Sequence, residues 1–313
     1  MTHRSASKPF SSRFAGRTGS GAVLLIAAVA FHAWVAFGSE PSSEMATDAS
    51  PRYGEPRKVA ELLDEDIDES SGVAASHRHA GVFWTHNDSG DGPRLYAFDR
   101  DGKTVARVDV QGATSVDWED MSSFQFGGKS WLALADVGDN ARRREFCTLY
   151  VVEEPELDQR HAAPKLTIRF RYEDGPHDCE AIAVDAAAGE VLLVSKVFGL
   201  SCRVYRVELD WKSRESKRTA ALVASLSLPL ATAADISSDG RRMLVATYLD
   251  GYEYSRRKDE SWKEALSRKP RAVSLPRRAQ GEAACYAADG RAIYLTSEKL
   301  PTPLWELPLQ NEE

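Results

Sequence analysis

Residues 180–210, EAIAVDAAAGEVLLVSKVFGLSCRVYRVELD, determine the fold class that this sequence predicts. Three short runs rich in Val, Ile, Leu and Tyr are separated by the turn AAAGE and by a polar loop. Aliphatic β-branched and aromatic residues fit the pleated surface of a strand. A short turn containing Gly joins antiparallel neighbours. The segment therefore predicts three antiparallel strands connected in sequence.

The same plan occurs five times along the chain. Each segment has an acidic or small leading residue, an apolar run, a turn, a second apolar run, a polar loop and a third run. Runs such as 165–172 (KLTIRFRY), 221–229 and 271–276 then supply a fourth strand. The leading residues, at intervals of 50, 61, 52 and 50, are Glu69, Glu119, Glu180, Thr232 and Glu282. Repeated antiparallel units of four strands are typical of β-propellers.

We therefore predict an all-β chain, a five-bladed β-propeller of four-stranded antiparallel blades. The run at 57–66, RKVAELLDED, is the fourth strand that the last repeat lacks, so an N-terminal strand would close the ring. Only WKEALSR, residues 262–268, predicts a helical turn or two. The alternative is an irregular β-sandwich, which seldom repeats one period five times.

The N-terminal residues resemble a targeting segment. Residues 1–18 are basic and Ser-rich, and residues 19–38 contain no charge. This pattern fits a signal peptide cut after Gly38, or an uncleaved membrane anchor, since about 20 apolar residues span a bilayer. Both readings predict an exported protein, periplasmic or secreted, with membrane contact only through this segment. Residues 39–56 predict a flexible linker, and residues 57–313 the propeller domain.

The net charge argues against a nucleic-acid-binding protein, and the cysteine spacing argues against a cysteine-ligated metal site. The 313 residues carry a formal net charge of -7, from 40 basic and 47 acidic residues. Four of the bases and none of the acids precede residue 39, so the remainder has a net charge of -11. A body this acidic is a poor partner for nucleic acid. The four cysteines show no metal-binding spacing, and we expect buried thiols, with one disulfide left open.

Alignment of the repeats predicts a ring of oxygen ligands. In a propeller the innermost strands line a central channel, so the equivalent residues at their starts face one axis. These residues are Glu69, Glu119, Glu180, Thr232 and Glu282, with Ser70, Ser71, Asp120 and Asp178 alongside. Carboxylate and hydroxyl oxygens suit a hard cation, and Ca²⁺ tolerates irregular geometry. The alternative is a water-filled channel with acids bonded to water and backbone.

A second set of polar residues ends the second strand of each repeat, on the same face. These candidate ligand-binding residues are Asp88, Asp136, Lys196, Tyr248 and Glu298. If the site is catalytic, the candidates for moving protons or binding phosphate are Asp88, His177 and Lys196. The alternative for the aspartates is a turn held by side-chain bonds to the local backbone.

The ring resembles a known family. Its order of hydroxyl, Glu, Glu, hydroxyl and Glu is similar to that of the calcium-activated nucleotidase (apyrase) propellers. The resemblance implies a central Ca²⁺ that supports hydrolysis of nucleoside di- and triphosphates. The residues carried over are Ser71 (or Glu69), Glu119, Glu180, Thr232 and Glu282. The blocks FWTHNDSGD, LALADVGDN and DCEAIAVD also resemble exported bacterial propellers of the phytase-like or esterase-like kind.

Two functions follow from these observations. The first is an exported propeller that binds a divalent cation in its channel and a small molecule or a protein on the channel face. The second is a Ca²⁺-dependent phosphohydrolase, nucleotidase- or phytase-like, in which the cation activates water or polarises a phosphoryl oxygen. In that case Lys196 and the run Arg142–Arg144 would neutralise phosphate.

Overall fold

Short apolar runs form strands throughout the computed structural model, which describes residues 52–310 apart from 198 and 200. The described residues are all-β except for one four-residue helix, α1 (Trp262–Ala265), which lies in the predicted helical segment. Ser261 and Glu264 form a reciprocal capping box that begins this helix. No helix among the described residues is long and apolar enough to cross a membrane.

Each repeat supplies strands in a fixed order. The first strands are β2 (Ser70–Ala75), β6 (Trp118–Phe126), β11 (Cys179–Asp185), β15 (Ala231–Ile236) and β19 (Ala284–Tyr286). The second strands are β3 (Val82–Asn87), β7 (Lys129–Asp136), β12 (Glu190–Ser195), β16 (Arg242–Thr247) and β20 (Ala292–Leu295). The third are β4 (Arg94–Asp99), β8 (Cys147–Glu153), β13 (Cys202–Glu208), β17 (Asp250–Ser255) and β21 (Pro303–Pro308). The outer strands are β5 (Thr104–Val110), β10 (Pro164–Tyr172), β14 (Glu215–Leu226), β18 (Arg271–Ser274) and β1 (Arg57–Glu61).

Strand pairing departs from five separate four-stranded sheets in two places. Strands β10 and β14 pair in parallel from Thr167 opposite Glu215, so two antiparallel groups merge into one eight-stranded sheet. A short strand, β9 (His161–Ala162), adds in parallel to β5 and makes another sheet five-stranded. Taken in the chain order of β2, β6, β15 and β19, the observed sheets therefore have 5, 8, 4 and 4 strands, and the N-terminal strand β1 belongs to the last of them. Sequence periodicity gave no sign of these parallel contacts between outer strands.

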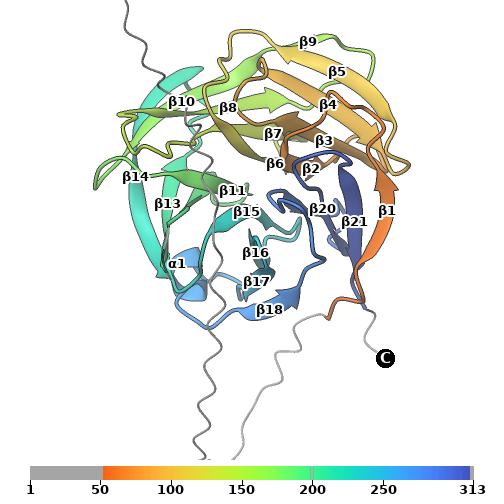
Figure 1. Ribbon diagram of the computed structural model, residues 1–313. Helices are drawn as coiled ribbons and strands as arrows, with labels where there is room; N and C mark the ends of the chain where they lie inside the picture. The colour runs from red at the N-terminus through yellow and green to blue at the C-terminus, as the bar shows by residue number, and fades with distance from the viewer. Residues whose placement is uncertain (1–51, 198, 200, 311–313) are drawn as a thin grey trace, which may run out of the picture. The chain divides into compact units, whose positions relative to one another are not determined.

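The first strands lie around a common centre (Figure 1). Each contacts the next in chain order, β2 with β6, β6 with β11, β11 with β15 and β15 with β19, and β19 contacts β2. β2, β11, β15 and β19 are buried along their whole length, because sheets pack on both sides of them. The predicted N-terminal pairing is present: β1 runs antiparallel to β21. Tyr53, within the predicted linker, forms a bridge with Leu309.

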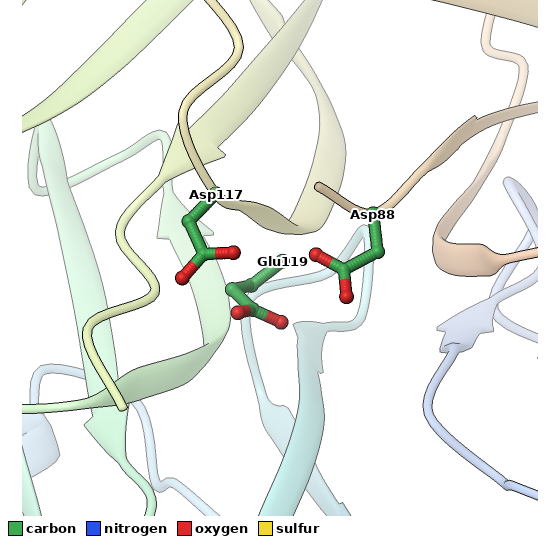
Figure 2. A group of neighbouring side chains, drawn as sticks. All are labelled: Asp88, Asp117 and Glu119. Carbon is green, nitrogen blue, oxygen red and sulfur yellow. The ribbon is translucent and has the colours of Figure 1, made fainter. Parts of the chain in front are cut away.

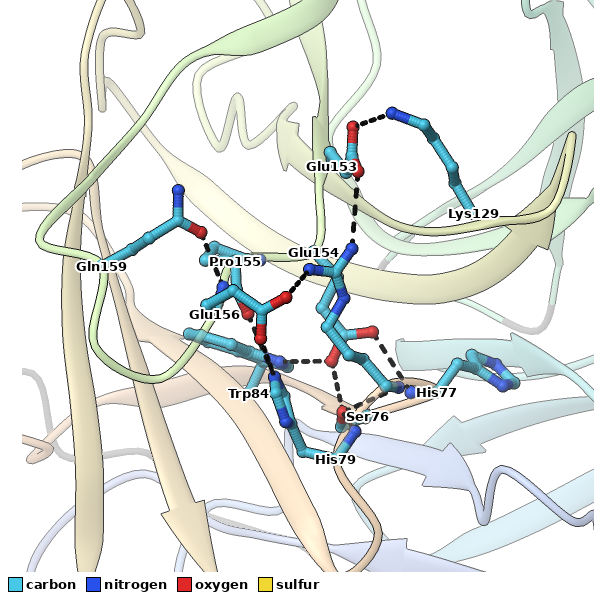
Figure 3. Close-up of polar contacts among 11 residues, drawn as sticks. Ser76, His77, His79, Trp84, Lys129, Glu153, Glu154, Pro155, Glu156 and Gln159 are labelled. Carbon is cyan, nitrogen blue, oxygen red and sulfur yellow. Dashed lines mark hydrogen bonds and ion pairs between the residues drawn. The ribbon is translucent and has the colours of Figure 1, made fainter.

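Apolar clusters lie between neighbouring sheets, and buried carboxylates link the sheets near their edges. Glu154, which is 1% exposed, accepts hydrogen bonds from the Ser76 hydroxyl, from Trp84 Nε1 at 2.9 Å and from the His77 amide at 3.2 Å (Figure 3). These bonds join the β2–β3 turn to the end of β8. A buried carboxylate needs such donors, so this cluster is structural.

Two smaller expectations are also met. All four cysteines are free and buried. The glycines of the three predicted hairpin turns, Gly189, Gly240 and Gly290, have φ values of 67°, 67° and 68°, which favour glycine. The predicted signal peptide or anchor at residues 1–38 lies outside the described residues.

Candidate functional site

A β-bulge stands at the same place in the first strand of four repeats. The pairing register shifts across Ser71 in β2, Glu119 in β6, Glu180 in β11 and Thr232 in β15, so each is an extra residue without a partner across the ladder. Bulges redirect a side chain out of the regular alternation. The fifth repeat has the same shift near Glu282, because Gln280 bridges Glu298 whereas Ala284 faces Leu295.

The bulges bring three glutamates together at the centre. Carboxylate oxygens of Glu119, Glu180 and Glu282 all lie within 4.8 Å of one another, and the residues are 4%, 3% and 4% exposed. They come from three repeats and lie up to 163 positions apart in sequence, and the repeat alignment had placed these positions around one axis. We call these residues the inner triad.

Two of the three inner glutamates have hydrogen-bond donors. Lys196 Nζ donates to Glu180 Oε2 at 2.8 Å and lies 5.2 Å from the centre of the Tyr248 ring. The Tyr248 hydroxyl donates to Glu282 Oε1 at 2.5 Å, and Gln280 Nε2 donates to the same oxygen at 3.0 Å. No hydrogen bond or ion pair to the Glu119 side chain is found within the described part of the chain. Glu119 is therefore a buried carboxylate that lies beside several other acids and has no donor among the described residues.

Burial and mutual repulsion raise the pKa values of these acids. Burial raises the pKa of Glu119 well above its ordinary value, and Glu180, Asp88, Asp117 and Glu282 raise it further. Burial raises the pKa of Glu180 to about 7 although Lys196 opposes the shift. Burial disfavours the charge of Lys196, but Glu180 outweighs it and raises the pKa of the ammonium group. The cluster holds more negative charge than its own cations neutralise.

More acids continue the cluster toward the end of the second strands. Asp88 follows β3, Asp117 precedes β6, and their carboxylate oxygens lie with one of Glu119 inside a 4.8 Å group (Figure 2). Glu298 is 5% exposed; it accepts a hydrogen bond from Gln280 at Oε2, and its Oε1 has no partner among the described residues. Burial and then Glu282 raise the pKa of Glu298 to about 9.

The remaining residues of the predicted ring, Ser71, Thr232 and Glu69, lie in three different environments. The Ser71 Oγ is buried with no hydrogen-bond partner in the described structure. Thr232 is buried and donates to the Gly281 carbonyl at 3.0 Å. Glu69 is exposed and forms a bridge with Glu298 two residues before the bulge. Ser71 rather than Glu69 therefore holds the position equivalent to Glu119.

The other predicted residues divide between the site and its surroundings. Lys196, Tyr248, Glu298 and Asp88 belong to the acid cluster. Asp136 is 1% exposed and binds Arg144 at 2.8 Å, so it supports the wall of the site. The three aromatic and acidic partners of His177 lie outside the cluster: Asp174 at 2.8 Å, Tyr205 at 2.7 Å and the Tyr172 ring.

Sequence reasoning did not assign Asp117, Gly138 or Gln280 to the site. A signal for two of them was present, because Asp117 and Gln280 stand two residues before Glu119 and Glu282, as Asp178 does before Glu180. When Ser71 is aligned with Glu119, Glu69 takes the same position two residues before the bulge. Nothing in the sequence indicated that Gly138 approaches the acids: a Cβ there would lie 2.1 Å from Glu119 Oε1 and 2.5 Å from Asp117 Oδ2.

The raised pKa values predict that the metal-free protein loses stability as pH rises. Glutamate titrates near 4.5 in the unfolded chain, whereas Glu180 and Glu298 titrate at about 7 and about 9 in the folded protein. The folded state binds more protons in this interval, so the free energy of unfolding should fall from about pH 5 to about pH 9. Urea denaturation in chelator measures it, and Glu298→Gln should flatten the alkaline part of the decline. A rise across this interval would contradict the assignment.

Comparisons with known proteins give little beyond this geometry. No protein-family model matches the chain, and no curated protein is detectably similar in sequence. Among solved structures, a gluconolactonase from Xanthomonas campestris is similar over 83% of this chain and 97% of its own, with 11% identity and a TM-score of 0.46. A likeness of this degree transfers no residue role to this chain.

Proposed function

We propose that this chain is an exported five-bladed propeller that binds Ca²⁺ at the inner triad and presents the ion to a small oxygen-bearing ligand. The proposal rests on one observation. Three buried glutamates from three repeats converge at equivalent bulges, and the Ser71 Oγ at the bulge of a fourth repeat has no partner in the described structure. Acids placed together in this way need a cation or protons. A bound divalent ion supplies the missing positive charge.

The set of ligands supports calcium over magnesium. Ca²⁺ binds oxygen at about 2.3–2.6 Å and accepts irregular arrangements of carboxylates. The inner triad, whose carboxylate oxygens all lie within 4.8 Å of one another, offers oxygen ligands alone. Mg²⁺ binds at about 2.0–2.1 Å and requires a nearly ideal octahedron, for which it usually keeps several waters. Three carboxylates and one hydroxyl leave coordination positions for a ligand, since Ca²⁺ takes about 6–8 oxygens.

Ligand contacts would come from the residues at the ends of the second strands. Lys196 and the Tyr248 hydroxyl act on the inner glutamates, and Asp88 and Glu298 lie beside them. We propose that a small molecule with carboxylate, hydroxyl or carbonyl oxygens binds the ion here. The alternative occupant is an acidic loop of a protein partner.

Calcium titration of the full chain tests the cation. Because the ion binds the folded state, the melting temperature should rise with calcium concentration. At a calcium concentration 100 times the dissociation constant, the free energy of unfolding should be larger by about 2.7 kcal/mol. Magnesium at the same concentration should produce a smaller shift. A melting temperature independent of calcium would refute the proposal.

The phosphohydrolase alternative receives less support from the described residues. Lys196 is paired with Glu180 and Arg144 with Asp136, so two of the four basic groups expected to neutralise phosphate are already engaged. His177, a candidate for proton transfer, contacts a separate group. Release of inorganic phosphate from ADP, UDP and phytate, with and without Ca²⁺, decides between the two. Calcium-dependent turnover that Glu180→Gln abolishes would establish the hydrolase.

A further inference from the structure

We propose that a second divalent cation binds at Asp88, Asp117 and Glu119, an outer triad, and that Glu119 bridges the two cations. The inference rests on the proposed function, because the inner cation binds the same glutamate. Carboxylate oxygens of the outer triad all lie within 4.8 Å of one another, as those of the inner triad do. The three carboxylates point toward one another from the end of β3, from the loop before β6 and from β6 itself (Figure 2).

The environment of Glu119 points to a ligand independently of the clustering. This residue is only 4% exposed, and its carboxylate has no hydrogen bond or ion pair with any described residue. A carboxylate in a largely buried position without a donor is unfavourable, and buried polar groups are almost always paired. A carboxylate has two oxygens, so one residue can serve two cations. Glu119 is the member that both triads share.

Charge near the outer triad also favours a second ion. Lys196 stabilises the ionised form of Asp88, and Arg144 that of Asp117. Each of these cations is engaged at 2.8 Å by another carboxylate, Glu180 and Asp136 respectively. One divalent ion in the inner triad therefore leaves Asp88 and Asp117 without a cation of their own. They are less buried than Glu119, so the outer ion should bind more weakly.

Gly138 gives the two carboxylates the space that a shared site requires. A Cβ at this position would overlap Glu119 Oε1 and Asp117 Oδ2, at 2.1 Å and 2.5 Å. Its backbone does not need glycine, since Gly138 is not among the glycines with positive φ. Gly138→Ala should therefore fold while it displaces oxygens of both triads.

The test counts calcium bound per full chain by equilibrium dialysis over a range of calcium concentrations. We expect two ions in the wild type, the second at higher calcium, and one ion in the double variant Asp88→Asn/Asp117→Asn. Gly138→Ala should weaken both binding steps at least about tenfold while the melting temperature in chelator stays within a few degrees. Asp101→Asn, on the exposed turn after β4, is the control that removes a negative charge away from the cluster, and it should keep both ions.

The outcomes separate the two proposals. A single ion that Glu180→Gln/Glu282→Gln removes and Asp88→Asn/Asp117→Asn retains would overturn the outer site and leave the proposed function standing. A single ion with the reverse dependence would overturn the inner site and the bridge together. Absence of bound calcium in the wild type would overturn both. Unchanged binding in Gly138→Ala would contradict the bridging role of Glu119.

Discussion

Glutamine in place of Glu119 is expected to raise the melting temperature in chelator and to lower it in calcium. Without a cation, the Glu119 carboxylate has no donor among the described residues and lies among other acids, so its removal relieves repulsion and desolvation. With calcium, the same substitution removes a ligand. A residue with only a packing role would change stability in the same direction in both buffers.

The two effects should be large enough to separate. For a chain of this size each kcal/mol changes the melting temperature by about 2–4 °C, and loss of a ligand should reduce calcium affinity at least about tenfold, which is about 1.4 kcal/mol. Thermal melting in chelator and in saturating calcium measures both. Glu145→Gln is the control, because it is the same change at an exposed glutamate without a hydrogen bond or ion pair to any described residue. Destabilisation by Glu119→Gln in chelator would show that a donor holds the ionised carboxylate.

Much of the fold follows from local signals in the sequence. Nearby residues determine the strand positions, the three glycine turns and the capped helical turn. The repeated pattern predicts that residues 57–61 join the last sheet. The parallel pairing of β10 with β14 does not, because it joins outer strands of two repeats through backbone hydrogen bonds. Backbone pairing of this kind has no residue-specific signature.

The site was predictable where it repeats. Glu119, Glu180 and Glu282 share a position in the period, and repetition brings equivalent positions to one centre. The choice between Glu69 and Ser71 remained open because it depends on a bulge, a shift of one residue that apolar patterns do not mark. The role of Gly138 could not be predicted from the sequence, because it depends on the absence of a side chain beside two acids that only the structure brings close.

The structural role of Asp120 was also not predictable from the sequence. It was expected beside the ring as a further acid, but its carboxylate accepts three backbone hydrogen bonds. The donors are Met121 at 2.8 Å, Ile182 at 2.8 Å and Ala234 at 3.2 Å. Each lies two residues after a bulge, after Glu119, Glu180 and Thr232 respectively. Asp120, which is fully buried, thus fixes the spacing of three strands that carry the ring.

Asp120→Ala should therefore be the most destabilising substitution near the site. It leaves three buried amides without an acceptor, at about 1–3 kcal/mol each. The loss is therefore about 3–9 kcal/mol, from a total that is typically about 5–15 kcal/mol. Urea denaturation measures this loss, and Asp101→Ala on an exposed turn should change stability by less than about 0.5 kcal/mol. Asp120→Asn keeps one acceptor oxygen and should lose less. If Asp120→Ala were as stable as the control, the three strands would be held at their spacing by sheet packing alone, and the convergence of the glutamates would not depend on this carboxylate.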